Sequence, residues 1–145
     1  MPAVGTASFN HVGQCVTDLE RSRRFYVEVF GFEVARELRP PDQGSDRLLG
    51  LRAPLGMTAC YLKRDDFVLE LLHFADAGTA PGEERVMNQP GLTHLSLSVD
   101  GIEEALAAVE ANGGEVLADT NLGMAVFVKD PDGQLIELLT GWDKP

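Results

Sequence analysis

The chain has 145 residues, the size of one domain, and 44% of them are hydrophobic, as in an ordinary globular protein. It has 12 basic and 23 acidic residues, a net charge of −11 and no basic cluster, which excludes nucleic acid and anionic membranes as expected partners. The first residues lack the basic stretch and long apolar core of a signal peptide, no apolar run is long enough to span a bilayer, and there are two cysteines, Cys15 and Cys60. We therefore expect a cytoplasmic protein without a disulfide framework.

The first half of the chain, residues 7–75, predicts the element order β-α-β-β-β. A strand is predicted at residues 9–16, with His11 in its third position. Thr17 and Glu20 have the spacing of a capping box, so a helix should begin there and end at Gly31 in a left-handed cap. Strands are expected at 32–38, 57–62 and 67–74, separated by a long loop at 39–55 that contains at most one short turn of helix.

The second half repeats this order over residues 91–142, after a linker at about 76–90 that is rich in glycine, proline and acidic residues. Its first strand, at residues 92–99, carries His94 in the third position, and Asp100 should cap the following helix. That helix is expected to end at 112–114, before strands at 115–118, 124–128 and 134–140. Such a repeat predicts one duplicated domain whose two units pack around a shared cleft.

Each unit also has a single glutamate in a short apolar run, Glu70 in the first and Glu137 in the second. Because side chains of a strand alternate between faces, each glutamate should share a core-facing side with apolar neighbours. A carboxylate placed there is unfavourable unless it is paired or binds a cation.

Each of the four residues alone could be an ordinary surface residue, but all four recur in register. We therefore predict that His11, Glu70, His94 and Glu137 bind one divalent metal ion (Zn, Ni, Co, Mn or Fe). In an octahedral shell, four protein ligands leave two positions open for oxygen atoms of a substrate.

The chain resembles the vicinal oxygen chelate superfamily, which includes glyoxalase I, methylmalonyl-CoA epimerase, extradiol dioxygenases, and fosfomycin and bleomycin resistance proteins. The resemblance is carried by short motifs along nearly the whole chain, at residues 10–12, 18–22, 25–26, 30–32, 69–71, 91–94, 130–133 and 136–138. It implies an α+β fold in which two paired β-α-β-β-β modules form a curved mixed sheet around a metal cleft. It also implies a homodimer whose sites combine modules from both chains.

The four predicted ligands match the ligand set of glyoxalase I-like members, whereas epimerase-like members usually have glutamine at the position of Glu70. This favours a lyase or isomerase that transfers a proton next to a metal-bound carbonyl through an enediolate. The catalytic base would be Glu137 or Glu70, and the sequence leaves both open.

Glutathione-using glyoxalases commonly carry an arginine four residues after the first ligand and an asparagine four residues after the second. This chain has Cys15 and Phe74 there, and neither can form a charge-assisted bond to a glutathione carboxylate. We expect a different small-molecule substrate, in a pocket lined by Cys15, Leu72, Phe74 and Ser96. Two alternatives stay open: an Fe(II) extradiol-type dioxygenase, and a non-catalytic protein that binds a small molecule or an antibiotic.

Overall fold

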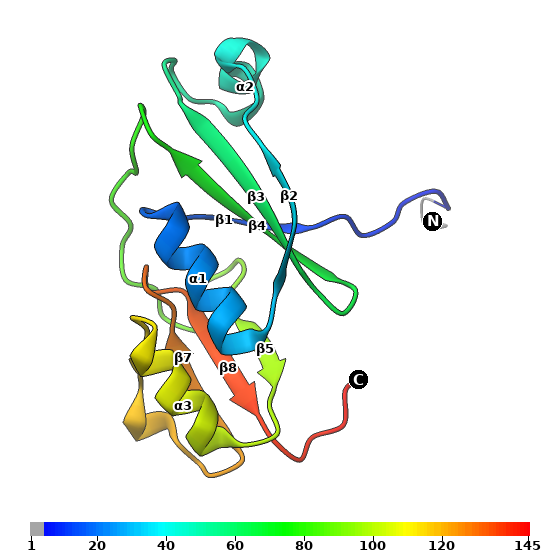
Figure 1. Ribbon diagram of the computed structural model, residues 1–145, viewed down its shortest axis with the longest axis vertical. Helices are drawn as coiled ribbons and strands as arrows, with labels where there is room; N and C mark the ends of the chain where they lie inside the picture. Colours follow the sequence, from blue (N-terminus) through cyan, green and yellow to red (C-terminus); the bar gives the residue numbers. More distant parts are fainter. Residues whose placement is uncertain (1–4) are drawn as a thin grey trace.

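The structure, a computed structural model, describes residues 5–145 and consists of two units that each combine a four-stranded sheet with helices (Figure 1). The first unit contains β1 (Val12–Cys15), α1 (Leu19–Phe30), β2 (Glu33–Leu38), α2 (Asp42–Leu49), β3 (Met57–Arg64) and β4 (Phe67–Phe74). The second contains β5 (Leu95–Ser98), α3 (Ile102–Ala111), β6 (Glu115–Val116), a 3₁₀ turn η1 (Ala118–Thr120), β7 (Ala125–Lys129) and β8 (Leu135–Leu139).

The two sheets have the same topology, with strand orders β1-β4-β3-β2 and β5-β8-β7-β6. In each sheet the first strand runs parallel to the last, and the other neighbours are antiparallel. This confirms the predicted α+β class and the paired β-α-β-β-β units. Within the described part of the chain, no helix is both long and apolar enough to cross a membrane.

Helix α1 begins one residue later than the capping-box spacing predicts. Asp18 is the N-cap and its carboxylate accepts a hydrogen bond from the backbone N–H of Arg21, whereas the Thr17 hydroxyl donates to Asp132 in the second unit. The predicted end is confirmed, because Gly31 adopts a left-handed conformation with φ of 68°.

The other two helices also differ from the sequence prediction. The N-cap of α3 is Gly101, without a side-chain hydrogen bond, so the predicted cap at Asp100 is wrong by one residue. The segment expected to be a loop contains α2, which is interrupted near Gly44. The Asp42 carboxylate at the start of α2 accepts hydrogen bonds from the backbone N–H groups of Leu55 and Gly56, which closes this segment.

The hydrophobic core lies between the helices and one face of each sheet. Leu69 and Leu71 of β4, and Ile136 and Leu138 of β8, are fully buried in it. Glu70 and Glu137 alternate with these residues and therefore lie on the opposite faces. The expectation that the glutamates face the core is wrong, because β4 and β8 carry apolar residues on both faces and alternation alone does not identify the core side.

The two units are joined by hydrogen bonds to a buried carboxylate at the turn between β7 and β8. The Asp130 carboxylate is 3% exposed and accepts from Tyr26 Oη at 2.8 Å and from Gln14 Nε2 at 3.0 Å. Both donors belong to the first unit. Burial, together with the nearby Asp130 charge, raises the pKa of the Tyr26 phenol well above its usual value. This turn, which belongs to the motif at residues 130–133, thus links the second unit to the first.

Candidate functional site

In the first unit, His11 and Glu70 form a close pair. His11 immediately precedes β1, and its Nε2 lies 3.4 Å from Oε1 of Glu70 on β4. Gly13 is the partner of Glu70 in the strand register, and a Cβ at Gly13 would lie 3.0 Å from that carboxylate oxygen. The glycine therefore leaves the space that the Glu70 carboxylate occupies, and Glu70 itself is 8% exposed.

Tyr61 completes this cluster from the other neighbouring strand. It pairs with Glu70 in the antiparallel register of β3 and β4. Its ring lies edge-on to the His11 ring, with the two ring centroids 5.3 Å apart. A hydrogen bond to Glu70, with smaller effects of burial and of the Glu70 charge, raises the pKa of Tyr61 to about 12. Tyr61 is thus a neutral donor at physiological pH. Sequence analysis did not identify it, although strand pairing across the turn at 65–66 would have placed it opposite Glu70.

The second unit repeats this arrangement. His94 immediately precedes β5, and its Nε2 lies 3.8 Å from Oε1 of Glu137 on β8. Phe127 pairs with Glu137 in the register of β7 and β8. Its ring lies edge-on to the His94 ring, with the two ring centroids 5.2 Å apart. Ser96 of β5 also pairs with Glu137 and donates a hydrogen bond to it at 2.9 Å.

One chain does not bring the four predicted ligands together. Among residues 5–145 no group of three or more His, Cys, Asp or Glu side chains is arranged so that it could hold a metal ion. The structure instead forms two half-sites: the first is His11 with Glu70, and the second is His94 with Glu137. Each half-site offers an imidazole nitrogen and a carboxylate oxygen, donors that suit Zn, Ni, Co, Mn or Fe(II). Two half-sites together would neutralise a divalent cation.

The predicted pocket residues divide between the two units. Cys15 pairs with Leu72 in the register of β1 and β4, so both share the face of Glu70, as does the nearly buried Phe74. Ser96 lies in the second unit beside Glu137. Partial burial, with a smaller contribution from Asp132, raises the pKa of the Cys15 thiol, so this cysteine is not an activated nucleophile.

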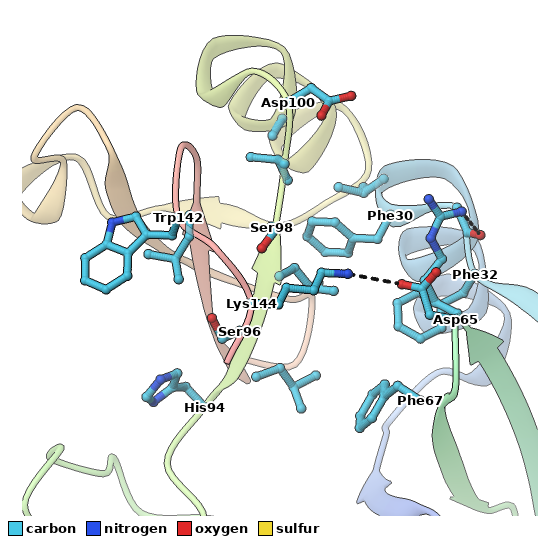
Figure 2. A pocket seen from close by; sticks show the side chains of 18 of the residues that line it. Phe30, Phe32, Asp65, Phe67, His94, Ser96, Ser98, Asp100, Trp142 and Lys144 are labelled. Atoms are coloured by element: carbon cyan, nitrogen blue, oxygen red, sulfur yellow. Dashed lines mark hydrogen bonds and ion pairs between the residues drawn. The ribbon is translucent and has the colours of Figure 1, made fainter.

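A groove of about 1260 Å³ lies between the two units (Figure 2). Phenylalanine side chains of the first unit lie on one side of it, and His94, Ser96 and Ser98 follow β5 on the other. An ion pair between Lys144 Nζ and Asp65, 3.7 Å long, spans part of the groove. The groove reaches His94 but is not lined by His11, Glu70 or Glu137. It therefore contacts only one residue of the candidate ligand set.

A duplicated β-α-β-β-β unit with a His–Glu pair in each copy defines the class of fold and site. Residues 8–138 match the family described as "Glyoxalase/Bleomycin resistance protein/Dioxygenase superfamily", and the chain belongs to that superfamily.

Two relatives named lactoylglutathione lyase illustrate the similarity. The protein of Salmonella typhimurium is 29% identical over 138 residues, which cover 88% of each chain. The protein of Arabidopsis thaliana is 29% identical over 149 residues, which cover 95% of this chain and 46% of the plant protein. The chain thus spans about half the length of the plant relative.

Solved structures show the same fold. A glyoxalase family protein from Bacillus cereus superposes with a TM-score of 0.78 at 18% identity, and the match covers 95% of this chain and 98% of that one. The trypanothione-dependent glyoxalase I of Leishmania major has a TM-score of 0.66 at 25% identity and covers 90% and 84% of the two chains.

Proposed function

We propose that the protein is a metal-dependent lyase or isomerase of the glyoxalase type. The observation that carries this proposal is the repeated His–Glu pair, with Nε2–Oε1 distances of 3.4 and 3.8 Å at matching register positions of the two units. Both pairs lie away from the helix-covered core, so core packing does not account for them. The family relationship and the two relatives named lactoylglutathione lyase support the same chemistry.

The metal site would require two copies of the chain. Each unit contributes one half-site, so the first half-site of one copy would face the second half-site of another in a homodimer. Exposed apolar side chains beside both histidines support this assembly, since Phe9 is 72% and Leu92 is 78% exposed. The bound metal would supply Lewis-acid stabilisation of the charge that develops when a C–H group next to a carbonyl loses its proton.

The residues of the chain would then carry the proton. Glu137 or Glu70 accepts it from the carbon next to the carbonyl and returns it to the neighbouring carbon. Cys15 and Phe74 offer no positive charge near the first half-site, so we propose a small-molecule carbonyl substrate other than a glutathione adduct.

Metal analysis tests the site directly. Protein purified without added metal should contain about one divalent ion per chain, as expected for two sites in a symmetric dimer. The His94→Ala variant should lose this metal. Ser98→Ala, a change in the adjoining strand β5, should retain it. Wild-type protein that takes up none of Zn, Ni, Co, Mn or Fe would contradict the proposal.

Proton transfer is tested on the metal-loaded protein. Incorporation of solvent deuterium at the carbon next to a carbonyl would show the reaction, whichever thiol the substrate carries. Comparison of lactoylglutathione formation with product formation from uncharged thiols would test the substrate preference. A clear preference for glutathione would contradict the expected role of Cys15 and Phe74.

A further inference from the structure

Each half-site contains a histidine, an aromatic ring and a glutamate. The residue that carries a hydroxyl group beside the glutamate lies on a different neighbouring strand in each half-site. In the first half-site the hydroxyl belongs to Tyr61 on β3, the antiparallel neighbour of Glu70. The parallel neighbour is Gly13, which has no side chain to offer.

In the second half-site these positions are reversed. The antiparallel neighbour of Glu137 is Phe127, which has a ring but no hydroxyl. The parallel neighbour is Ser96, and its hydroxyl donates to Glu137 at 2.9 Å. Each carboxylate therefore has one hydroxyl-bearing neighbour in the strand register, although the two neighbours come from opposite sides of the glutamate strand.

The comparison of Tyr61 with Phe127 shows which contacts need the aromatic ring and which need the hydroxyl group. Phe127 contacts His94 edge-on as Tyr61 contacts His11, so packing against a histidine requires only the ring. Tyr61 also carries a hydroxyl group, and it pairs with Glu70 in the strand register. Groups that hydrogen-bond to a metal-ligating carboxylate fix its orientation and typically change metal affinity about 10- to 100-fold when removed.

We propose that Tyr61 is a positioning residue for Glu70 in the metal site, and that Ser96 performs the same role for Glu137 from the other neighbouring strand. This inference rests on the proposed function, because the carboxylates are oriented for a metal ion.

The test compares zinc dissociation constants, measured by competition with a chromophoric chelator. Tyr61→Phe removes one oxygen and keeps the ring, and we expect zinc binding about 10- to 100-fold weaker than in the wild type. Cobalt-substituted protein should also show altered visible absorption bands, since a shifted Glu70 changes the metal coordination. Tyr26→Phe is the matched control: it removes the oxygen of the other tyrosine, which bonds to Asp130 and lies outside both half-sites, and zinc affinity should change little.

A rescue experiment tests the same idea in the second unit. Ser96→Ala should weaken zinc binding, and the double variant Ser96→Ala/Phe127→Tyr should recover much of it, because the new phenol takes the place that Tyr61 has in the first unit. A merely structural role of Ser96 would not allow this recovery.

The outcomes distinguish the two proposals. If the wild type binds zinc and Tyr61→Phe binds it within about twofold, far below the usual effect of such a partner, the positioning role is wrong and the proposed function stands. If the wild type binds no zinc, both fail. If Tyr61→Phe does not fold by circular dichroism, the Ser96 and Phe127 variants decide, and absence of recovery in the double variant overturns the inference.

Discussion

At the residue scale, both tyrosines of the chain lie beside carboxylates: Tyr26 donates a hydrogen bond to Asp130, and Tyr61 pairs with Glu70 in the strand register. Burial raises the pKa of Tyr26 well above 10, and the bond to Glu70 raises that of Tyr61 to about 12. Both values exceed the value of about 10 in the unfolded chain. The stability that these phenols contribute is therefore complete below about pH 10 and is lost as the pH rises through the folded-state values.

An alkaline titration checks this, because tyrosinate absorbs in the near ultraviolet. The folded protein should show no tyrosine ionisation near pH 10, where the urea-unfolded chain ionises both groups. Glu70→Gln should lower the Tyr61 step from about 12 towards 10, since the charged acceptor is gone. Tyrosinate formed in the folded wild type at about pH 10 would contradict the contacts of both residues.

Gly114 lies where the second unit packs against the first with no space for a side chain. A Cβ there would lie 2.6 Å from the Lys129 carbonyl oxygen and 2.7 Å from side-chain atoms of both Phe25 and Val109. We expect Gly114→Ala to lower the free energy of unfolding by about 1–3 kcal/mol, as overpacked cores do, in urea denaturation. Gly82→Ala is the control, since it meets no atom within 4 Å and should change stability by less than about 0.5 kcal/mol. Equal stability of the two variants would show that the packing can relax.

At the element scale, periodicity predicted most strands and helices, because apolar spacing depends on neighbours along the chain. Helix starts were less well predicted. Thr17 and Asp18 can both cap, and only the position of Asp132 in the other unit determines that Thr17 binds elsewhere. The repeat also revealed the two His–Glu pairs. Tyr61 was missed because its role depends on the pairing of two strands, which the apolar spacing within one strand does not reveal.

The turn between β7 and β8 should contribute more stability than its counterpart between β3 and β4. Asp130→Asn replaces one carboxylate oxygen with an N–H donor that faces the donors Tyr26 and Gln14, and we expect a loss of about 1–3 kcal/mol. Asp65→Asn is the matched change, at an exposed residue that forms an ion pair with Lys144. It should alter stability by less than about 0.5 kcal/mol, as exposed ion pairs contribute little. Thermal unfolding of both variants measures the difference, and similar losses would show that the inter-unit hydrogen bonds are weak.

At the scale of the whole molecule, the separated half-sites make the assembly testable by mixing inactive chains. His11→Ala and His94→Ala each damage one half-site, so neither variant alone should bind metal. In a mixed dimer one site would contain both changes and the other would be intact, so unfolding and refolding the two variants together should restore metal binding. Sites formed within single chains would give no recovery, because every chain carries a defect.

The hydrogen bonds of Asp130 also bear on how such a chain could arise and be altered. Residues 75–90 between the units are exposed throughout, whereas the contact of Asp130 with Tyr26 is buried and that with Gln14 is partly buried. The mutual placement of the units is therefore specified by side chains, and the connecting peptide mainly keeps the two halves at high local concentration. After a gene duplication, the peptide that joins the two units could therefore have almost any length that spans the distance between them. Two separately expressed halves, cut within this connection, should still recognise each other.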